Sequence, residues 1–148
     1  MEGPAIIMAL YLTEADVGEL LSMPLALEAV EEAFAAKARG EAVNLPRRRI
    51  TLGEGAYNIM AAGWPSKGVA GHKAYVAARG RAQFHVSLYS TRGEGLLAIV
   101  EASRLGQVRT GAASGLATRL MACAGPLAVG VIGSGFQAET QLEAIAAA

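Results

Sequence analysis

The residues best suited to chemistry in this sequence are cations set in apolar or close-packed surroundings. Arg47, Arg48 and Arg49 stand in a row in the segment LPRRRITL, and alternation along a strand sends the first and third to one face. Lys73 lies in the apolar run VAGHKAYVA, and Arg109 lies among the small residues of GQVRTGAAS. Two arginines and a lysine could bind a carboxylate, because the guanidinium fork offers bidentate hydrogen bonds. A solvated strand end and a snorkelling lysine are the alternatives.

A second chemical feature is a glycine pattern near the C-terminus, where GSGFQA (133–138) follows the apolar segment LAVGVI (127–132). This is the G-x-G-x-x-G/A order of a dinucleotide-binding turn. In such a turn Gly133 makes the tight bend, Gly135 lets backbone amides reach a pyrophosphate, and Ala138 lets helix and strand pack closely. We therefore predict a buried strand, a turn that binds NAD or NADP, and a helix whose N-terminus favours the anion. An ordinary strand-to-helix turn is the alternative.

The rest of a nucleotide site would lie beyond this sequence. The acidic residue that binds the ribose follows the turn by about 20 residues in such domains, which is past Ala148, so NAD and NADP are not distinguished. One βα unit also cannot supply the neighbouring strands of a parallel sheet. We expect a first domain over residues 1–125 and a Rossmann domain that begins at 126 and is truncated.

Composition and the remaining candidate residues argue against several function classes. The 13 basic residues balance the 13 acidic ones, so the formal net charge of +0 gives no general attraction to nucleic acid. His72, His85 and Cys123 do not form a metal-binding pattern. Ser114 and Ser134 lack the setting of a nucleophile. The single cysteine, with no signal-peptide pattern and no apolar stretch of about 20 residues, predicts a soluble cytoplasmic protein without a membrane partner.

Short strands must position these residues. From Leu45 onwards the apolar pattern changes towards a period of two, and glycine-containing turns separate five runs. The runs are RRITL, AYNIMA, VAGHKAYVA, FHVSLYS and LLAIVEA. They predict a largely antiparallel meander. Such a sheet buries one face and leaves the other for solvent, a ligand or another subunit.

Helices are predicted before and after the meander. Thr13 and Asp16 have the spacing of a weak capping box for a short first helix, and Pro24 opens a second. A third helix is expected over about 103–123, although it contains three glycines. They are Gly106, Gly111 and Gly115. Glycine costs about 1 kcal/mol relative to alanine inside a helix, so close approach of another backbone or a ligand is expected there.

Several of these segments together resemble the ornithine cyclodeaminase/mu-crystallin family. The segments are LPRRRITL, NIMAAGWP, GHKAY, LGQVRTGAASGLATRLMA and GVIGSGFQA. The resemblance runs from about Leu10 to the end, and VRTGAAS and the glycine turn are its most specific parts. It implies an α/β fold in which an α+β substrate-binding and dimerisation domain precedes the first βα unit of a Rossmann domain. It also implies a homodimeric NAD(P)-dependent enzyme that transfers hydride at an amine-bearing carbon of a small amino or imino acid, through an imine.

The resemblance also implies roles for individual residues. Arg47 and Arg109 match arginines that bind the substrate carboxylate, and Lys73 matches the active-site lysine. Thr110 matches a residue that helps to bind the cofactor phosphates. The cofactor turn contains Gly133, Gly135, Phe136 and Gln137. A desolvated lysine near two arginines would have its charged form disfavoured by its neighbours and by burial, which suits proton transfer at neutral pH.

The sequence also departs from the family pattern. Ornithine-specific members carry a glutamate where this chain has Asn58, two residues before the methionine that matches Met60. A neutral amide holds a second substrate ammonium less strongly, which argues against ornithine. The family's usual Pro and Asn pattern is missing after Lys73, and the acid/base aspartate would lie beyond Ala148. Lyase, dehydrogenase and reductase activities stay open, as do a mu-crystallin-like binding protein without turnover and a structural remnant that dimerises through its sheet.

Overall fold

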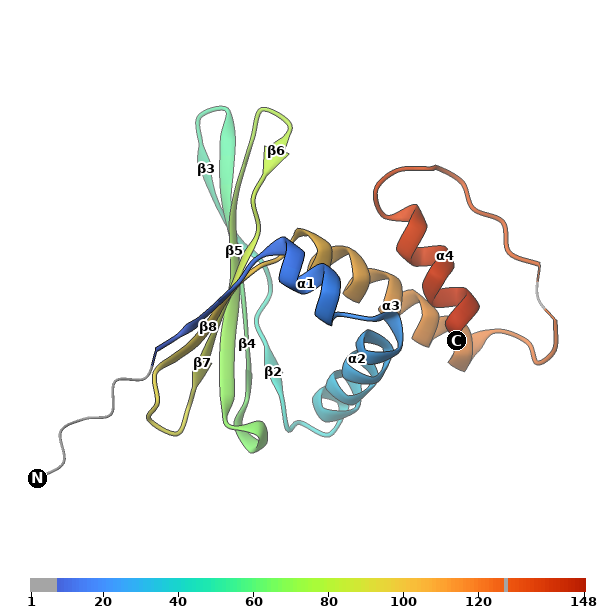
Figure 1. Ribbon diagram of the computed structural model, residues 1–148, viewed down its shortest axis with the longest axis horizontal. Helices are drawn as coiled ribbons and strands as arrows, with labels where there is room; N and C mark the ends of the chain where they lie inside the picture. Colours follow the sequence, from blue (N-terminus) through green and yellow to red (C-terminus); the bar gives the residue numbers. More distant parts are fainter. Residues whose placement is uncertain (1–7, 127) are drawn as a thin grey trace, which may run out of the picture.

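The computed structural model describes residues 8–126 and 128–148, which form one mixed sheet with helices against one side of it (Figure 1). The strands are β1 (Leu10–Leu12), β2 (Val43–Asn44), β3 (Arg48–Leu52), β4 (Gly55–Trp64), β5 (Val69–Ala78), β6 (Arg81–Ala82), β7 (His85–Ser90) and β8 (Leu96–Glu101). Their order is β1-β8-β7-β5-β4-β2, with β3 paired to β4 and β6 paired to β5. The mixed α/β class is therefore confirmed.

The predicted meander is present. Each of the five apolar runs contains a strand, and β4, β5, β7 and β8 pair in succession as antiparallel neighbours. The sequence did not reveal β1, β2 and β6, because strands of three residues or fewer are too short to show a period. β1 runs parallel to β8 and pairs with it at the edge of the otherwise antiparallel sheet.

The first two helices begin with side-chain caps, of which the sequence predicts the one at Thr13. They are α1 (Glu14–Leu20), α2 (Met23–Ala38), the 3-10 helix η1 (Pro65–Lys67), α3 (Ser103–Met121) and α4 (Ala138–Ala147). The Thr13 N–H donates to the Asp16 carboxylate at 2.8 Å, and the Asp16 N–H donates to the Thr13 hydroxyl at 3.3 Å, so the capping box is confirmed. The Ser22 hydroxyl caps α2, whose first turn contains Pro24.

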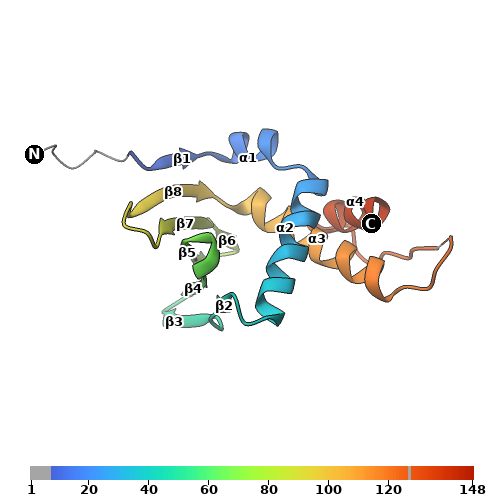
Figure 2. The ribbon, with the colours of Figure 1, turned by 90° about the horizontal axis from the view of Figure 1, so that it is seen from below.

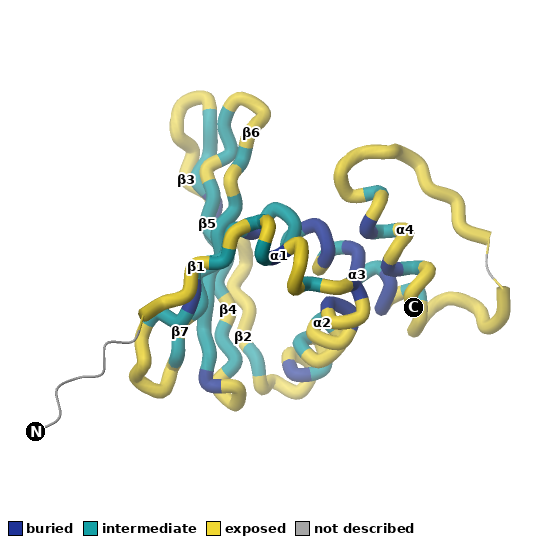
Figure 3. Tube along the Cα trace, viewed as in Figure 1, coloured by how far each residue is buried: buried dark blue, intermediate teal, exposed yellow. Residues whose placement is uncertain are grey.

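The best-buried apolar residues lie between helices rather than within the sheet. Figure 2 shows the helices together on one side, and Figure 3 shows that most sheet residues are only partly buried. The core cluster comes from α2, α3 and α4. It contains Met23, Ala26, Leu27, Val108, Ala112 and Ala144. The helix-facing side of the sheet is therefore incompletely covered, which leaves room for a ligand.

Two glycines allow α4 to pack directly on α3. A side chain at Gly111 would collide with the carbonyl of Thr140, and one at Gly115 would collide with the carbonyl of Ala144. Thr140 and Ala144 are fully buried by this contact. The predicted close approach of a second backbone is therefore confirmed at these two glycines, whereas Gly106 has open space around it.

The predicted buried strand over 127–132 is wrong where it can be checked. Residues 128–134 form no strand, and Leu127 lies outside the described residues. Val131 is 44% exposed and Ile132 is 105% exposed. The N–H and C=O groups of a parallel strand need a neighbouring strand, and none of the described strands is paired with this segment. It forms instead part of the loop between α3 and α4 (Figure 1).

Candidate functional site

Lys73 lies in β5 on the sheet face that looks towards the helices. It pairs with Met60 of β4 and with Val86 of β7, so the three side chains share one face. Arg47 lies in the segment just before β3, close enough to Lys73 for its charge to act on the ammonium group. Met60 and Lys73 thus stand in one row across the sheet, and Arg47 is near this row.

The ammonium group of Lys73 is partly buried beside two aromatic rings. Its Nζ lies 5.3 Å from the centroid of the Phe84 ring and 5.7 Å from that of Tyr75. Burial lowers the pKa of Lys73, and the positive charges of Arg109 and Arg47 lower it further. The structure therefore brings together three cations that come from β5, from α3 and from the segment before β3.

These three cations have no anionic partner among the described residues. The ion pairs that the described chain forms are Arg39–Glu41, Lys67–Glu32, Arg79–Glu54, Arg104–Glu139 and Arg119–Glu31. Arg47 and Arg109 are also exposed. A carboxylate from a ligand can therefore bind both guanidinium groups without displacing an acidic side chain.

Arg49 is a fourth cation on this face, one row further along the sheet. Its pairing with Asn58 places it on the side of Lys73 and places Arg48 on the opposite side, as the alternation predicts. Nε of Arg49 donates to Oδ1 of Asn58 at 3.1 Å, and Nδ2 of Asn58 donates to the Ala56 carbonyl at 3.3 Å. Asn58 is only 1% exposed, so the buried amide holds the Arg49 side chain in a defined position. Sequence reasoning identified Asn58 but missed its bond to Arg49.

A cavity of about 440 Å³ opens between α2 and the sheet. Lys73 is one of its lining residues, and Phe34, Met60, Trp64 and Leu88 give it a mainly apolar wall. The cavity can therefore accept an apolar group beside Lys73.

The glycine turn lies in the exposed loop before α4. Gly133 has a φ of +103°, in the left-handed region that glycine adopts most easily. Gly135, Phe136 and Gln137 are exposed. No other part of the described chain lies within 4 Å of the place where a Cβ on Gly133 or Gly135 would stand. The backbone of the turn is thus open to a ligand.

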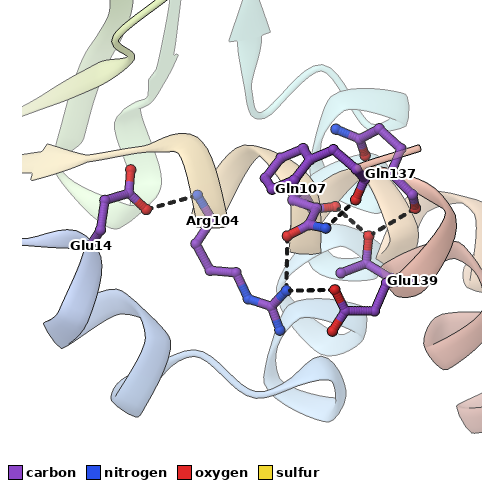
Figure 4. Close-up of polar contacts among 7 residues, drawn as sticks. Glu14, Arg104, Gln107, Gln137 and Glu139 are labelled. Atoms are coloured by element: carbon purple, nitrogen blue, oxygen red, sulfur yellow. Dashed lines mark hydrogen bonds and ion pairs between the residues drawn. The ribbon is translucent and has the colours of Figure 1, made fainter. Parts of the chain in front are cut away.

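Gln107 of α3 holds this turn in place, and sequence reasoning missed it (Figure 4). It is 2% exposed. Its Nε2 donates to the Phe136 carbonyl, and its Oε1 accepts from Nη1 of Arg104 at 2.8 Å. Oγ1 of Thr140 donates to the Gln107 backbone carbonyl at 3.2 Å. Gln107 could have been found from its spacing: it stands four residues before Gly111 and therefore lies on the same face of the helix.

The first turn of α3 is bound from the other side by Glu14 of α1 (Figure 4). Its carboxylate accepts from the N–H of Ser103 at 2.6 Å and from the N–H of Arg104 at 2.9 Å. Burial acts to raise the pKa of Glu14, but these hydrogen bonds outweigh it and the pKa is lowered. The carboxylate thus satisfies free N–H groups at a helix N-terminus, where negative charge is favoured.

Thr110 lies next to Arg109 in α3 and is partly buried. Its hydroxyl donates to the Gly106 carbonyl at 2.6 Å, so the proton of the hydroxyl is used within the helix. The oxygen keeps lone pairs that can accept a further hydrogen bond.

The described residues contain no group of three or more potential His, Cys, Asp or Glu metal ligands. None of the described helices is long and apolar enough to cross a membrane.

Comparison with known proteins identifies the family. The sequence profile of the ornithine cyclodeaminase/mu-crystallin family matches residues 8–148. The chain belongs to this family. A curated relative from Archaeoglobus fulgidus, named alanine dehydrogenase, is 34% identical over 143 residues, which cover 92% of this chain and 44% of the relative. This member of the cyclodeaminase family therefore spans somewhat less than half the length of that relative.

Solved structures of similar proteins support the same family assignment. The probable ornithine cyclodeaminase of Bordetella pertussis has a TM-score of 0.89 at 28% identity, with 95% of this chain and 45% of that chain covered. The iminosuccinate reductase of Paracoccus denitrificans, solved with NAD+, gives 0.89 at 29% identity, with 94% and 46% covered. An archaeal alanine dehydrogenase dimer with bound NAD gives 0.87 at 34% identity, with 94% and 45% covered. The residue roles stay predictions for this cyclodeaminase-family chain.

Proposed function

We propose that this chain forms the substrate-binding part, residues 1–125, and the start of the nucleotide-binding part, residues 126–148, of an NAD(P)-dependent enzyme. The enzyme transfers hydride at the amine-bearing carbon of a small amino or imino acid. Family membership supports the proposal, and so do the similar alanine dehydrogenase and iminosuccinate reductase, both solved with NAD. The observation that carries it is the lowered pKa of Lys73 beside two arginines that lack a carboxylate partner in the described chain.

In this proposal Arg47 and Arg109 bind the substrate carboxylate, and Lys73 moves protons. The guanidinium groups hold the carboxylate in a defined orientation, which fixes the neighbouring amine-bearing carbon. The ordinary pKa of lysine is 10.5, and its lowering increases the neutral fraction of Nζ at neutral pH. Nζ can then accept a proton from the substrate amine and return it, as a general base and acid.

The glycine turn has features that fit the phosphates of a dinucleotide. Gly133 has the left-handed bend, the space beside Gly133 and Gly135 is open, and α4 begins directly after the turn. Phe136, Gln137 and Thr110 are the other residues proposed to contact NAD or NADP. When it is bound, the nicotinamide exchanges hydride with the substrate carbon.

The experiment tests Lys73 in the protein purified from its native host. Turnover is measured with a panel of amino acids and with NAD+ or NADP+, by the absorbance of the reduced nicotinamide. We expect Lys73→Met to lower kcat by about 100-fold or more, which is the usual effect of losing a general acid–base group. Lys67→Met is the matched control, because Lys67 is exposed, pairs with Glu32 and does not itself line the cavity, although its Nζ lies 5.3 Å from the centroid of the Trp64 ring.

Three outcomes separate the readings of this experiment. Wild-type turnover in the Lys73→Met variant would show that Lys73 moves no proton in the reaction. Loss of turnover in both variants would point to a general structural effect. Binding of NADH by the unaltered protein without turnover of any amino acid would favour a mu-crystallin-like binding protein.

We further propose a cytoplasmic homodimer that forms through the open face of the sheet. This face carries exposed apolar side chains from several strands, among them Tyr11, Ile50 and Val76, and the helices lie against the opposite side (Figures 1 and 2). Val76→Glu should convert the dimer to a monomer in sedimentation velocity. Leu120→Glu, at an exposed apolar position of α3, should leave the dimer intact. A dimer that survives Val76→Glu must use another surface.

A further inference from the structure

Two rows of side chains cross the helix-facing side of the sheet at neighbouring levels. One contains Met60 and Lys73, with Arg47 near it, and the next contains Arg49, Asn58 and Tyr75. The rows are two residues apart along β4, which is about 7 Å in a β-strand. A ligand bound by its carboxylate at the first row can therefore place a second polar group near Arg49 if its carbon chain is short.

Asn58 holds Arg49 in a way that leaves the outer part of the guanidinium free. The buried amide oxygen of Asn58 accepts a hydrogen bond from Nε of Arg49, and its amide nitrogen donates to the Ala56 carbonyl. The terminal Nη groups of Arg49 make no hydrogen bond to the described residues. These Nη groups are the donors that bind a carboxylate most effectively. A substrate side chain that reaches Asn58 therefore meets a positive charge.

The other charged side chains near Arg49 are also positive. Arg47, Arg49 and Arg109 all lack a carboxylate partner among the described residues. One substrate carboxylate cannot form bidentate bonds with three guanidinium groups. A second ammonium on the substrate would face Arg49 and be repelled, whereas a second carboxylate would find a prepared partner.

We propose that Arg49, oriented by Asn58, is a specificity-determining residue that binds a second carboxylate, so that the substrate is an amino or imino dicarboxylic acid. The inference rests on the proposed function, because that function assigns the first carboxylate to Arg47 and Arg109. The apolar cavity beside Lys73 is the alternative place for the substrate side chain, and binding there would favour an alkyl side chain.

The test is an NMR titration of the 148-residue chain with succinate, butyrate and hexanoate. Butyrate has the same number of carbons as succinate and only one carboxylate, and hexanoate lengthens the apolar end. We expect succinate to bind with a Kd about tenfold lower than that of butyrate, the effect of one charge-assisted contact. Hexanoate should bind no more tightly than butyrate.

Variants then assign the preference to Arg49. Arg49→Gln keeps an N–H donor for Asn58 and removes the charge, so it should abolish the advantage of succinate, and butyrate should lose much less affinity than succinate does. Arg48→Gln removes the same charge from the opposite face and should change neither. Arg47→Gln should weaken the binding of both succinate and butyrate.

The outcomes distinguish this inference from the function on which it rests. If succinate and butyrate bind alike, or Arg49→Gln preserves the difference, the second-carboxylate site is wrong while the first stands. If hexanoate binds most tightly, the side chain enters the cavity and the dicarboxylic substrate is wrong. If no acid binds, or Arg47→Gln leaves butyrate binding unchanged, the carboxylate site of the proposed function fails, and this inference fails with it.

Discussion

The strand β5 and the segment 128–134 show what a strand-like sequence needs from its surroundings. Both contain apolar residues and glycine. β5 is paired with β4 on one side and with β7 on the other. The segment 128–134 has no strand partner in the described chain, and its apolar side chains are exposed. The side-chain pattern thus permits a strand, and neighbouring backbone groups decide whether it forms.

The two regions also differ in how their candidate chemistry is positioned. Lys73 lies on a strand with neighbours on both sides, and its pKa responds to charges from α3 and from the segment before β3. The glycine turn is attached mainly after Gly135, where Gln107 binds the Phe136 carbonyl and α4 packs on α3. The carboxylate site is therefore better defined in this chain than the nucleotide site.

The largest predicted effect is a difference in backbone hydrogen exchange between these two regions. The amides of β5 that pair with β4 and β7 should be protected by about 10³-fold or more, because their exchange requires opening of the sheet. The amides of residues 128–132 should exchange nearly as fast as those of an unfolded peptide. Exchange resolved by NMR or mass spectrometry measures both regions in one sample.

An extended chain provides the control for this measurement. If further residues supply a parallel neighbour for residues 128–132, their amides should become protected while those of β5 stay as they are. Equal protection of both regions in the 148-residue chain would contradict the comparison, because segment 128–132 would then have found a strand partner without further chain.

A smaller effect tests why α4 is docked although the segment before it forms no strand. Gly111→Ala places a methyl group against the Thr140 carbonyl, so it should lower the free energy of unfolding by about 1–3 kcal/mol. Gly106→Ala is the matched change in the same helix. It should raise the free energy by up to about 1 kcal/mol, since it has open space and gains helix propensity. Urea unfolding measures both, and a harmless Gly111→Ala would show that the two helices are not in close contact.

The smallest predicted effect concerns the start of α3, which joins the two regions. The pKa of Glu14 is lowered from its ordinary 4.5, so its contribution to stability is full above that value and is lost as the pH falls through the lower folded pKa. Glu14→Gln should therefore reduce stability at neutral pH by at most about 1 kcal/mol, because the carboxylate is partly solvated. The difference between wild type and variant should shrink below about pH 4.5. Urea unfolding over a pH series checks this, and a difference that persists in acid would mean a role in packing rather than in charge.

Local patterns were enough to predict much of the fold. The alternation from Arg48 to Glu101 predicts the main strands, and the Thr13 capping box predicts the start of α1, because both depend on neighbours in the sequence. The opposite faces of Arg48 and Arg49 follow from the same alternation. The bond between Arg49 and Asn58 could not be predicted, since it depends on the register of the β3–β4 hairpin and on the burial of the amide.

The sequence by itself determined which residues can form strands, where the helices begin, and that cations and a glycine turn are present. Tertiary structure decided which of these features are realised. It set Arg109 near Lys73, and it placed Gln107 against the turn through the packing of α4 on α3. It also left residues 128–134 without a strand. The physical reason is that side-chain patterns are local, whereas electrostatic interactions, close packing and hydrogen bonds between strands require partners that only the folded chain brings together.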